Sequence, residues 1–349
     1  MKRIFSLLLL LALLLSGCGM DIAPAITVPT PSAEGTLQVH FIDVGQADCA
    51  LLEYGGEYML IDGGNVEDSS LVVSYLQKQG VQELAAVVCS HAHEDHAGGL
   101  PGVLAVFPTK AVYARTRTYS SKCFDDFVYY VNQQDLQIQI PSPGDTISFA
   151  GTSVTVLGPV KSYAETNDTS IVLKVIYGET SFLFTGDMET SAENDMLDYW
   201  SGKEDLHADV LKVGHHGSST STGYRFLYEV DPDYGVISVG EGNSYGHPNE
   251  EPLSRLADAD VTLYRTDRMG TVIASSDGKN ITFTWQQASA RPEDPTAPEE
   301  AAQYIGNINS KKLHLPSCAN LPKEENRITF DSYDEAIAAG YTPCGTCMK

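Results

Sequence analysis

The sequence predicts an α/β fold in which two β-sheets pack together with helices outside, followed by a small separate C-terminal domain. The chain has 349 residues, of which 42% are hydrophobic and 19% charged, enough for one large core and something small beside it. Strand-rich stretches mix with α/β units along residues 36–286, as expected for two packed sheets. An acidic, Pro-rich linker at 287–302 then separates this body from a tail at 303–349.

Strands are predicted where short apolar or alternating runs are bounded by turn residues. They cover 37–44, 50–54, 58–61, 85–89, 152–157, 170–177, 181–185, 210–213, 234–239, 261–264, 271–275 and 281–285. Gly55-Gly56 turns the second and third strands into a hairpin. Helices are predicted from apolar residues at helical spacing, at 69–79, 190–199, 223–230 and 250–257.

Residues 1–17 have the pattern of a cleaved export signal peptide. A short basic start precedes an apolar run at 7–15, which is shorter than the roughly 20 residues that a membrane-spanning helix needs. Leu15-Ser16-Gly17-Cys18 resembles the lipobox of bacterial lipoproteins, which implies that Cys18 becomes the lipidated first residue. An ordinary secretory signal with an incidental cysteine is the alternative. Residues 18–35 are expected to be a tether that holds the protein at the extracytoplasmic face of the cell membrane.

The chain is strongly acidic. It has 22 Lys+Arg and 46 Asp+Glu, a formal net charge of −24 that becomes about −26 without the signal peptide. Such a charge is a poor platform for binding nucleic acid through a basic surface, although a substrate phosphate held by metal ions remains compatible with it. The seven cysteines are scattered, which does not indicate a disulfide framework, and Cys49, Cys89 and Cys123 are expected to be buried thiols.

The strongest sequence motif is His91-Ala92-His93-Glu94-Asp95-His96, directly after a predicted buried strand. Its three imidazoles and the Asp95 carboxylate are ligands suited to Zn²⁺ or a similar divalent ion. Glu94 is expected to face outward. The alternative is a solvated polar turn, but the chain has only nine histidines, so their clustering here favours a metal site.

Three further loops carry candidate ligands, each after a predicted strand. Asp187 ends Thr185-Gly186-Asp187, where a carboxylate could bridge two metals. His215 and His216 follow Gly214, and His247 lies in a later loop. His247 taken singly would be a surface residue as often as a ligand, but four such loops together predict one site. His40 and His207 lack such a context and are expected to be structural.

The His-x-His-x-Asp-His run, the Thr-Gly-Asp turn and the later histidine resemble the metallo-β-lactamase fold superfamily. Three segments further resemble its ComEC/Rec2 type, namely 41–48, 211–218 and 242–248. ComEC proteins are DNA-uptake channels whose extracellular hydrolase domain is held to degrade the strand that is not transported. The resemblance spans 36–285 and implies an αββα sandwich with a dinuclear metal site on one edge. No channel-forming helices are visible in the sequence, so we expect a stand-alone relative.

The resemblance also implies roles for individual residues. One metal would be held by His91, His93 and His215, and the other by Asp95, His96 and His247, with Asp187 bridging. The metal-ligand histidine that many superfamily members carry between the first cluster and the bridging aspartate is missing, and 167–170 occupies that region, as in ComEC-like relatives. We expect His215 to take the vacant position and His216 to act in the second layer or as a proton donor, with the reverse order as the alternative.

Further roles concern the substrate and the ions. Asp95 could orient the attacking hydroxide, while Asn167 and Ser218 are candidates for contacting the substrate. The two ions are expected to be zinc, with manganese as the alternative. The missing histidine and the ComEC-like segments together argue against β-lactam hydrolysis.

The tail predicts a separate metal site. His314 and Cys318 lie four residues apart, and Cys344 and Cys347 form a Cys-x-x-Cys pair, which is sufficient for one structural Zn²⁺ in a domain with little core. The segment resembles the metal-binding domain of the Ada DNA-repair protein. That family typically uses four cysteines, so His314 is an inferred ligand. A disulfide between Cys344 and Cys347 is the alternative, and a helix is expected at 331–339.

Three functions compete at this level. The leading one is a surface-anchored, metal-dependent phosphodiesterase that cleaves DNA. The second is a phosphoesterase for small or cell-wall-linked substrates such as phosphocholine, which suits the acidic body slightly better. The third is a non-catalytic lipoprotein that binds DNA or a protein partner. Metal content separates them, because a binding module needs only the tail ion whereas the enzymes need about three ions per chain.

Overall fold

A computed structural model describes residues 35–286 and parts of the C-terminal segment, namely 304–314, 318, 321–330, 336–337, 339–344 and 347. The chain divides into two compact units, Met1–Ser289 and Ala290–Lys349. The expected signal peptide, Cys18, nearly all of the tether, the linker and most of the helix expected at 331–339 lie outside the described residues.

The first sheet of the body has eight strands in the order β15-β14-β1-β2-β3-β4-β5-β6. Neighbouring strands are antiparallel from β15 to β3 in this order, and parallel from β3 to β6. The strands are β1 (Leu37–Phe41), β2 (Ala50–Tyr54), β3 (Glu57–Ile61), β4 (Ala86–Cys89), β5 (Val112–Ala114), β6 (Ile138–Gln139), β14 (Thr271–Ser276) and β15 (Ile281–Gln286).

The second sheet has seven strands in the order β13-β12-β11-β10-β9-β8-β7. Here β10 to β13 run parallel and β7 to β10 antiparallel. The strands are β7 (Thr146–Ile147), β8 (Ser153–Gly158), β9 (Val172–Tyr177), β10 (Thr180–Phe184), β11 (Val210–Lys212), β12 (Tyr234–Ile237) and β13 (Thr262–Arg265).

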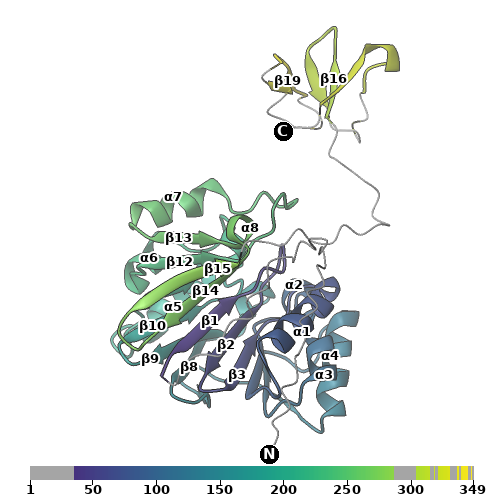
Figure 1. The fold of residues 1–349 in the computed structure, drawn as a ribbon. Coiled ribbons are helices and arrows are strands. Elements are labelled where there is room, and N and C mark those ends of the chain that lie inside the picture. The colour runs from purple at the N-terminus through teal and green to yellow at the C-terminus, as the bar shows by residue number, and fades with distance from the viewer. Residues whose placement is uncertain are drawn as a thin grey trace, which may run out of the picture. The chain divides into compact units, whose positions relative to one another are not determined.

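Strand periodicity explains why the sheets form layers. Side chains alternate between the faces of a strand, so Leu37, Val39 and Phe41 of β1 enter one buried cluster with Phe182 and Phe184 of β10. This cluster lies between the two sheets. Figure 1 shows the sheets face to face, with helices on the outside of each.

The outer faces of the sheets are covered by helices. Leu51 and Val87 of the first sheet join a cluster with side chains of α1, α3 and α4, and Leu183 of the second sheet joins one with α5 to α7. The helices are α1 (Ser69–Lys78), α2 (Glu94–Ala97), α3 (Leu100–Val106), α4 (Lys122–Gln133), α5 (Thr190–Trp200), α6 (Tyr224–Val230), α7 (Glu250–Asp258) and α8 (Thr266–Met269). This αββα arrangement confirms the predicted fold class.

The structure adds elements that the sequence analysis did not predict, chiefly α3, α4 and the short strands β5 to β7. The helix α2 at the end of the first motif was likewise not predicted. None of the described helices is long and apolar enough to cross a membrane.

The C-terminal unit contains a small sheet of four strands in the order β18-β16-β17-β19. Its buried apolar cluster is limited to Leu313, Phe330, Ala336 and Tyr341 among the described residues. The strands are β16 (Tyr304–Asn307), β17 (Lys312–His314), β18 (Arg327–Phe330) and β19 (Thr342–Pro343). So small a core indicates that another interaction must stabilise this unit.

Candidate metal centre

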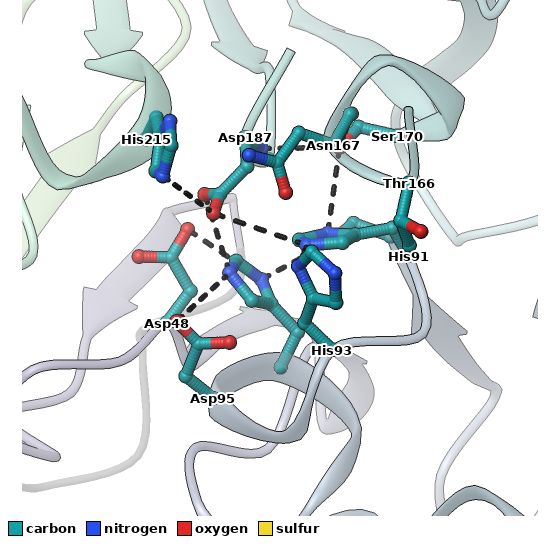
Figure 2. A network of polar contacts seen from close by, with 12 residues as sticks. Asp48, His91, His93, Asp95, Thr166, Asn167, Ser170, Asp187 and His215 are labelled. Atoms are coloured by element: carbon teal, nitrogen blue, oxygen red, sulfur yellow. Dashed lines mark hydrogen bonds and ion pairs between the residues drawn. The ribbon is translucent and has the colours of Figure 1, made fainter. Parts of the chain in front are cut away.

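The polar loops that the sequence singled out converge at one edge of the sandwich. They follow β4, β10, β11 and β12, each of which has at least one parallel neighbour, and the carboxyl ends of parallel strands lie at the same edge of a sheet. Figure 2 shows Asp187 near the middle of the group, with His215 on one side and His91 and His93 on the other. The site therefore forms where loops that follow strands of both sheets meet.

The first motif reaches this edge through the end of β4 and the start of α2. His91 is buried, and its Nε2 lies 3.1 Å from His93 Nδ1 and 3.8 Å from Asp187 Oδ2. His93 precedes α2, which places Asp95 and His96 in the single turn of that helix. Gly99 lets this turn pack closely, because a Cβ there would lie 2.0 Å from the Gly63 carbonyl oxygen.

A tight group of possible ligands is formed by Asp95, His96, Asp187 and His216. One ligand atom from each lies within 4.8 Å of those of the others. His96 Nε2 lies 3.2 Å from Asp187 Oδ1, and His216 Nε2 lies 3.2 Å from Asp95 Oδ2. Two carboxylates and two imidazoles at such distances form a donor set for a divalent transition metal such as zinc.

Two atoms of this group show that a cation would fit. Asp187 Oδ1 and His96 Nε2 are both buried and lie 3.2 Å apart, but neither atom forms a hydrogen bond of good geometry among the described residues. Buried polar atoms in native proteins are nearly always paired, so orphaned atoms of this kind require an explanation. A shared metal ion would satisfy both atoms, so the residues present fit the predicted metal.

Electrostatics around the cluster favour ionised carboxylates. Burial alone would raise the pKa of Asp187, but His96 and His216 outweigh it and hold the pKa well below its usual value. Burial likewise lowers the pKa of His216, but Asp187 and Asp48 outweigh it and raise the pKa to about 10, so a metal ion that binds His216 must displace a proton from it. Burial and the neighbouring His96 lower the pKa of His91, which therefore stays neutral as a ligand must.

The turn after β11 is strained in a way that aims two imidazoles at the site. His215 and His216 both have positive φ angles, 48° and 51°, which residues with a side chain rarely adopt. Gly217 follows at φ +81°, and a Cβ there would lie 2.5 Å from Pro248 Cβ. Strain of this kind costs on the order of 1–3 kcal/mol per residue and typically occurs where function demands it.

The positions of these two histidines favour the alternative order left open above. His216 is 2% exposed and belongs to the tight group, while its Nδ1 lies 3.0 Å from the Ser238 carbonyl oxygen, which leaves Nε2 facing the carboxylates. His215 is more exposed, with Nε2 3.7 Å from Asp187 Oδ2 and Nδ1 3.4 Å from Glu189 Oε1. The geometry therefore makes His216 the better ligand candidate.

His247 is not part of the group that contains Asp95 and His96, the two residues with which it was expected to share a metal. It is half-buried, its ring centroid lies 5.6 Å from that of His215, and its Nδ1 lies 3.4 Å from Gln46 Nε2. The tight group contains His216 in the place beside Asp95 and His96 that the sequence analysis gave to His247. Both His215 and His247 still line the cavity over the cluster.

Two buried residues that sequence reasoning did not name as site residues support the ligands. Asp62 accepts from the backbone N–H of Ser90 and lies 2.8 Å from His96 Nδ1. Asp48 lies 3.3 Å from His216 Nδ1 and 2.6 Å from Lys212 Nζ. Such partners fix the orientation of ligand imidazoles. The Asp62-Gly63-Gly64 turn directly after a buried strand was the signal that could have found Asp62.

A cavity of about 930 Å³ opens over the cluster. It is lined by His93, Asp95 and Asp187 and also by Asn167, whose Oδ1 is buried without a hydrogen-bond partner among the described residues. Asn167 thus lies where a substrate contact was expected. Ser218 does not line the cavity, and its Oγ lies 3.0 Å from Thr220 Oγ1. Glu94 is exposed, as expected.

The remaining histidines of the body have other surroundings. His40 is buried in β1 with Nδ1 2.7 Å from the Tyr75 hydroxyl, and burial lowers its pKa to about 4. His207 is partly exposed and lies beside the Val230 carbonyl oxygen. Among the described cysteines of the body, Cys49, Cys89 and Cys123 are buried thiols, which confirms that expectation.

In the C-terminal unit the four predicted ligands do meet. Ligand atoms of His314, Cys318, Cys344 and Cys347 all lie within 4.8 Å of one another. His314 Nδ1 lies 3.4 Å from Cys318 Sγ. A Cys344–Cys347 disulfide would account for two members of this cluster only. Convergence of all four fits a tetrahedral zinc site better, because it uses the imidazole as well as the three sulfurs.

Comparison with known proteins agrees with this geometry. ComE operon protein 3 of Bacillus subtilis (strain 168) is 28% identical over 263 residues, covering 70% of this chain and 33% of that protein. Competence protein ComA of Neisseria gonorrhoeae is 30% identical over 246 residues, again covering 70% and 33%. The chain thus spans about a third of the length of these curated relatives. These matches confirm the ComEC/Rec2-type resemblance.

Among solved structures, the metallo-beta-lactamase fold protein YhfI from Bacillus subtilis aligns with a TM-score of 0.44 at 13% identity, covering 71% of this chain and 100% of that one. Residues 280–349 match the family described as the metal binding domain of Ada, which confirms the resemblance of the tail. Residues 42–241, more than half of the sequence, match the family described as the metallo-beta-lactamase superfamily, which implies divalent metals. The chain therefore belongs to the metallo-beta-lactamase superfamily.

Proposed function

We propose that this protein is a lipid-anchored, extracytoplasmic phosphodiesterase that uses two divalent metal ions to cleave DNA. The observation that carries the proposal is the group of Asp95, His96, Asp187 and His216, with its orphaned buried atoms under an open cavity. The similarity to competence protein ComA favours DNA over another phosphodiester as the substrate. The lipobox-like motif at Cys18 supports the anchor.

The residues of the site divide the work. Two divalent ions bound here would supply an activated water and stabilise the attacking and leaving oxygens. Asp187, which faces both His91 and His96, is suited to bridge them. Asp95 Oδ2 lies beside His216 Nε2 and remains ionised, because His96 and His216 hold its pKa below the usual value against the effect of burial. Asp95 can therefore accept a hydrogen bond from a nucleophilic water and orient it.

Asn167 and His215 are placed to contact the substrate. The amide of Asn167 donates to Glu189 Oε1 at 3.2 Å, which fixes its orientation toward the cavity. His215 lies at the same wall, close to the same carboxylate. Because Glu189 already accepts from Asn167 Nδ2, the unpartnered Asn167 Oδ1 would accept a hydrogen bond from a donor group of the substrate.

The acidic charge of the chain sets a condition on this function. A net charge of −24 repels a polyanion, so binding must come from metal ions and local contacts and not from a basic surface. Short single strands suit such a site better than long duplex, because fewer phosphates approach the acidic body. We therefore expect single-stranded DNA to be cleaved faster than duplex.

The first experiment uses protein beginning at Glu34, supplied with Zn²⁺ or Mn²⁺, and compares it with its Asp187→Ala variant. Cleavage of single- and double-stranded DNA is followed on a gel, and bound metal is counted by mass spectrometry. We expect about three ions per chain and cleavage for the parent, against about one ion and at least a 100-fold loss of rate for the variant.

The control is Asp198→Ala, which removes an exposed carboxylate of α5 that pairs with Arg225 and should change neither readout. A parent that carries three ions but leaves DNA intact would end the nuclease proposal and make small phosphodiesters, phosphocholine esters among them, the substrates to test. A parent that carries only one ion would favour a binding protein.

A further inference from the structure

A second cavity adjoins the metal cluster on the side of β5 and the loop that precedes β9. Its volume is about 460 Å³, within the range of roughly 300–1,000 Å³ that is typical of small-molecule sites. His91 lines it, and so does Thr166, whose neighbour Asn167 lines the cavity over the metals. The candidate ligand His91 and the candidate substrate contact Asn167 thus lie between the two cavities.

The wall of this second cavity is aromatic and continues onto the metal cluster. Tyr119, Phe124 and Tyr163 line it. The ring of Tyr119 lies edge-to-face against Phe124, with 6.0 Å between centroids, and edge-to-face against His93 at 6.2 Å. The Tyr163 hydroxyl donates to Asp195 at 3.1 Å, which holds that ring in place. A flat ring system entering here would contact side chains that are already held in position.

The charge of the second cavity is opposite to that of its surroundings. No carboxylate lines it, whereas Glu67, Glu94, Asp95 and Asp187 line the neighbouring one. Its permanent cation is Arg115, which is half-buried and has no hydrogen-bond or ion-pair partner among the described residues. In a chain with 46 acidic residues, an arginine that has no ion-pair partner among the described residues is available for an external anion.

We propose that this cavity is a nucleotide subsite, in which the base of the residue next to the scissile bond enters the aromatic part and Arg115 pairs with the flanking phosphate. Stacking on aromatic rings and pairing with guanidinium groups are the contacts that single-stranded nucleic acid makes with proteins. The inference rests on the proposed function and names the substrate class more closely. It also disfavours phosphocholine here, because Arg115 repels a quaternary ammonium group.

The test measures binding apart from catalysis. Metal-loaded protein beginning at Glu34 is titrated calorimetrically with thymidine 5′-monophosphate, thymidine and phosphocholine, and so are the Arg115→Gln and Arg115→Lys variants. We expect the nucleotide to bind the parent at least 10-fold more tightly than phosphocholine does. We expect Arg115→Gln to weaken nucleotide binding about 10-fold, Arg115→Lys to restore most of it, and neither change to alter the binding of thymidine. Arg268→Gln, at an exposed arginine outside both cavities, is the matched control and should bind as the parent does.

A kinetic measurement separates the contact with the base from the contact with the phosphate. With a single-stranded oligonucleotide, Tyr119→Leu should raise KM about 10-fold while kcat stays within about 3-fold, since the ring contacts the substrate away from the reacting bond. Equal nucleotide affinity in the parent and in Arg115→Gln would overturn the subsite, even if DNA is cleaved. Arg115-dependent nucleotide binding in a protein that leaves DNA intact would support the subsite and overturn the nuclease proposal alone.

Discussion

At the scale of single residues, the metal cluster depends on which of two neighbouring histidines faces it. His216 is buried within the group of Asp95, His96 and Asp187, whereas His215 reaches the same carboxylate from a partly exposed position. We expect His216→Ala to lower metal affinity about 100-fold or more, since even residues behind the ligands typically contribute 10–100-fold. His215→Ala should retain both ions and lose activity only.

Metal titration with a chromophoric chelator, run beside a His207→Ala control, measures this difference. His207 lies beside the Val230 carbonyl oxygen and takes no part in the cluster. Retention of both ions by His216→Ala together with their loss from His215→Ala would restore the order of roles first expected from the sequence.

A second residue-scale prediction concerns Glu193, a buried carboxyl of α5 that accepts from the backbone N–H groups of Thr222 and Gly223. Burial raises its pKa from 4.5 to about 7. Because the folded state holds this proton more tightly than the unfolded state does, the contribution of Glu193 to stability is present below pH 4.5 and is lost as the pH rises to 7. Glu193→Gln abolishes this dependence.

Urea unfolding of the parent and of Glu193→Gln at several pH values tests the sign. Relative to the parent, the variant should become more stable by about 3 kcal/mol between pH 4 and pH 8. The exposed Glu204→Gln change should track the parent throughout. A constant difference between Glu193→Gln and the parent across this range would mean that Glu193 is ionised at neutral pH at little cost.

At the scale of elements, β11 is tied to the β1–β2 loop of the other sheet by a buried ion pair. Lys212 Nζ lies 2.6 Å from Asp48 Oδ2, with both side chains at most 7% exposed. Lys212→Met removes the nearest partner of the buried Asp48 carboxylate and leaves only histidines beside it, so it should cost up to about 3–5 kcal/mol. The Asp48→Asn/Lys212→Met double variant should recover a large part of that loss.

Chemical unfolding in the presence of a chelator isolates this effect from metal binding. The matched control is Lys110→Met, which breaks a solvent-exposed pair with Glu83 at a similar distance of 2.7 Å and should leave stability nearly unchanged. Equal stability of the two lysine variants would show that Asp48 is adequately solvated without its partner.

The elements themselves differ in how far the sequence predicted them. The strands next to the site, such as β2 and β10, were predicted to within a residue or two, because apolar runs bounded by turn residues mark them clearly. Helix α4 was missed although Cys123, Phe124, Phe127 and Val131 form its buried face. Polar and aromatic residues interrupt that pattern, and packing against α3 reveals which face is buried.

At the scale of the whole molecule, the two units differ in what stabilises them. The body has three large buried clusters, whereas the described part of the tail buries four apolar side chains around a cluster of four metal-binding residues. Metal binding should therefore supply most of the folding free energy of the tail. The Cys344→Ser/Cys347→Ser variant should lose one ion of about three and keep the unfolding midpoint of the body.

Fluorescence separates the two units, because the two tryptophans of the chain, Trp200 and Trp285, both lie in the body. Their emission follows the body during heating, while proteolysis of the tail reports on its folding. Ser310→Ala, in a turn of the tail, serves as the control. A lower body midpoint in the cysteine variant would show that the two units fold as one.

The sequence by itself determined the superfamily, the four side chains that meet in the tail and most of those at the candidate metal centre, because ligand chemistry depends on residue types at short spacing. His91, His93, Asp95 and His96 lie within six residues, and the strands on which they depend are marked by local apolar patterns. Only the tertiary structure decided which partners face one another across the two sheets. Long-range contacts, which no local pattern encodes, give Asp48, Asp62 and Lys212 their roles beside the ligands. The role proposed for Arg115 follows from its place in a cavity and from the lack of an ion-pair partner among the described residues.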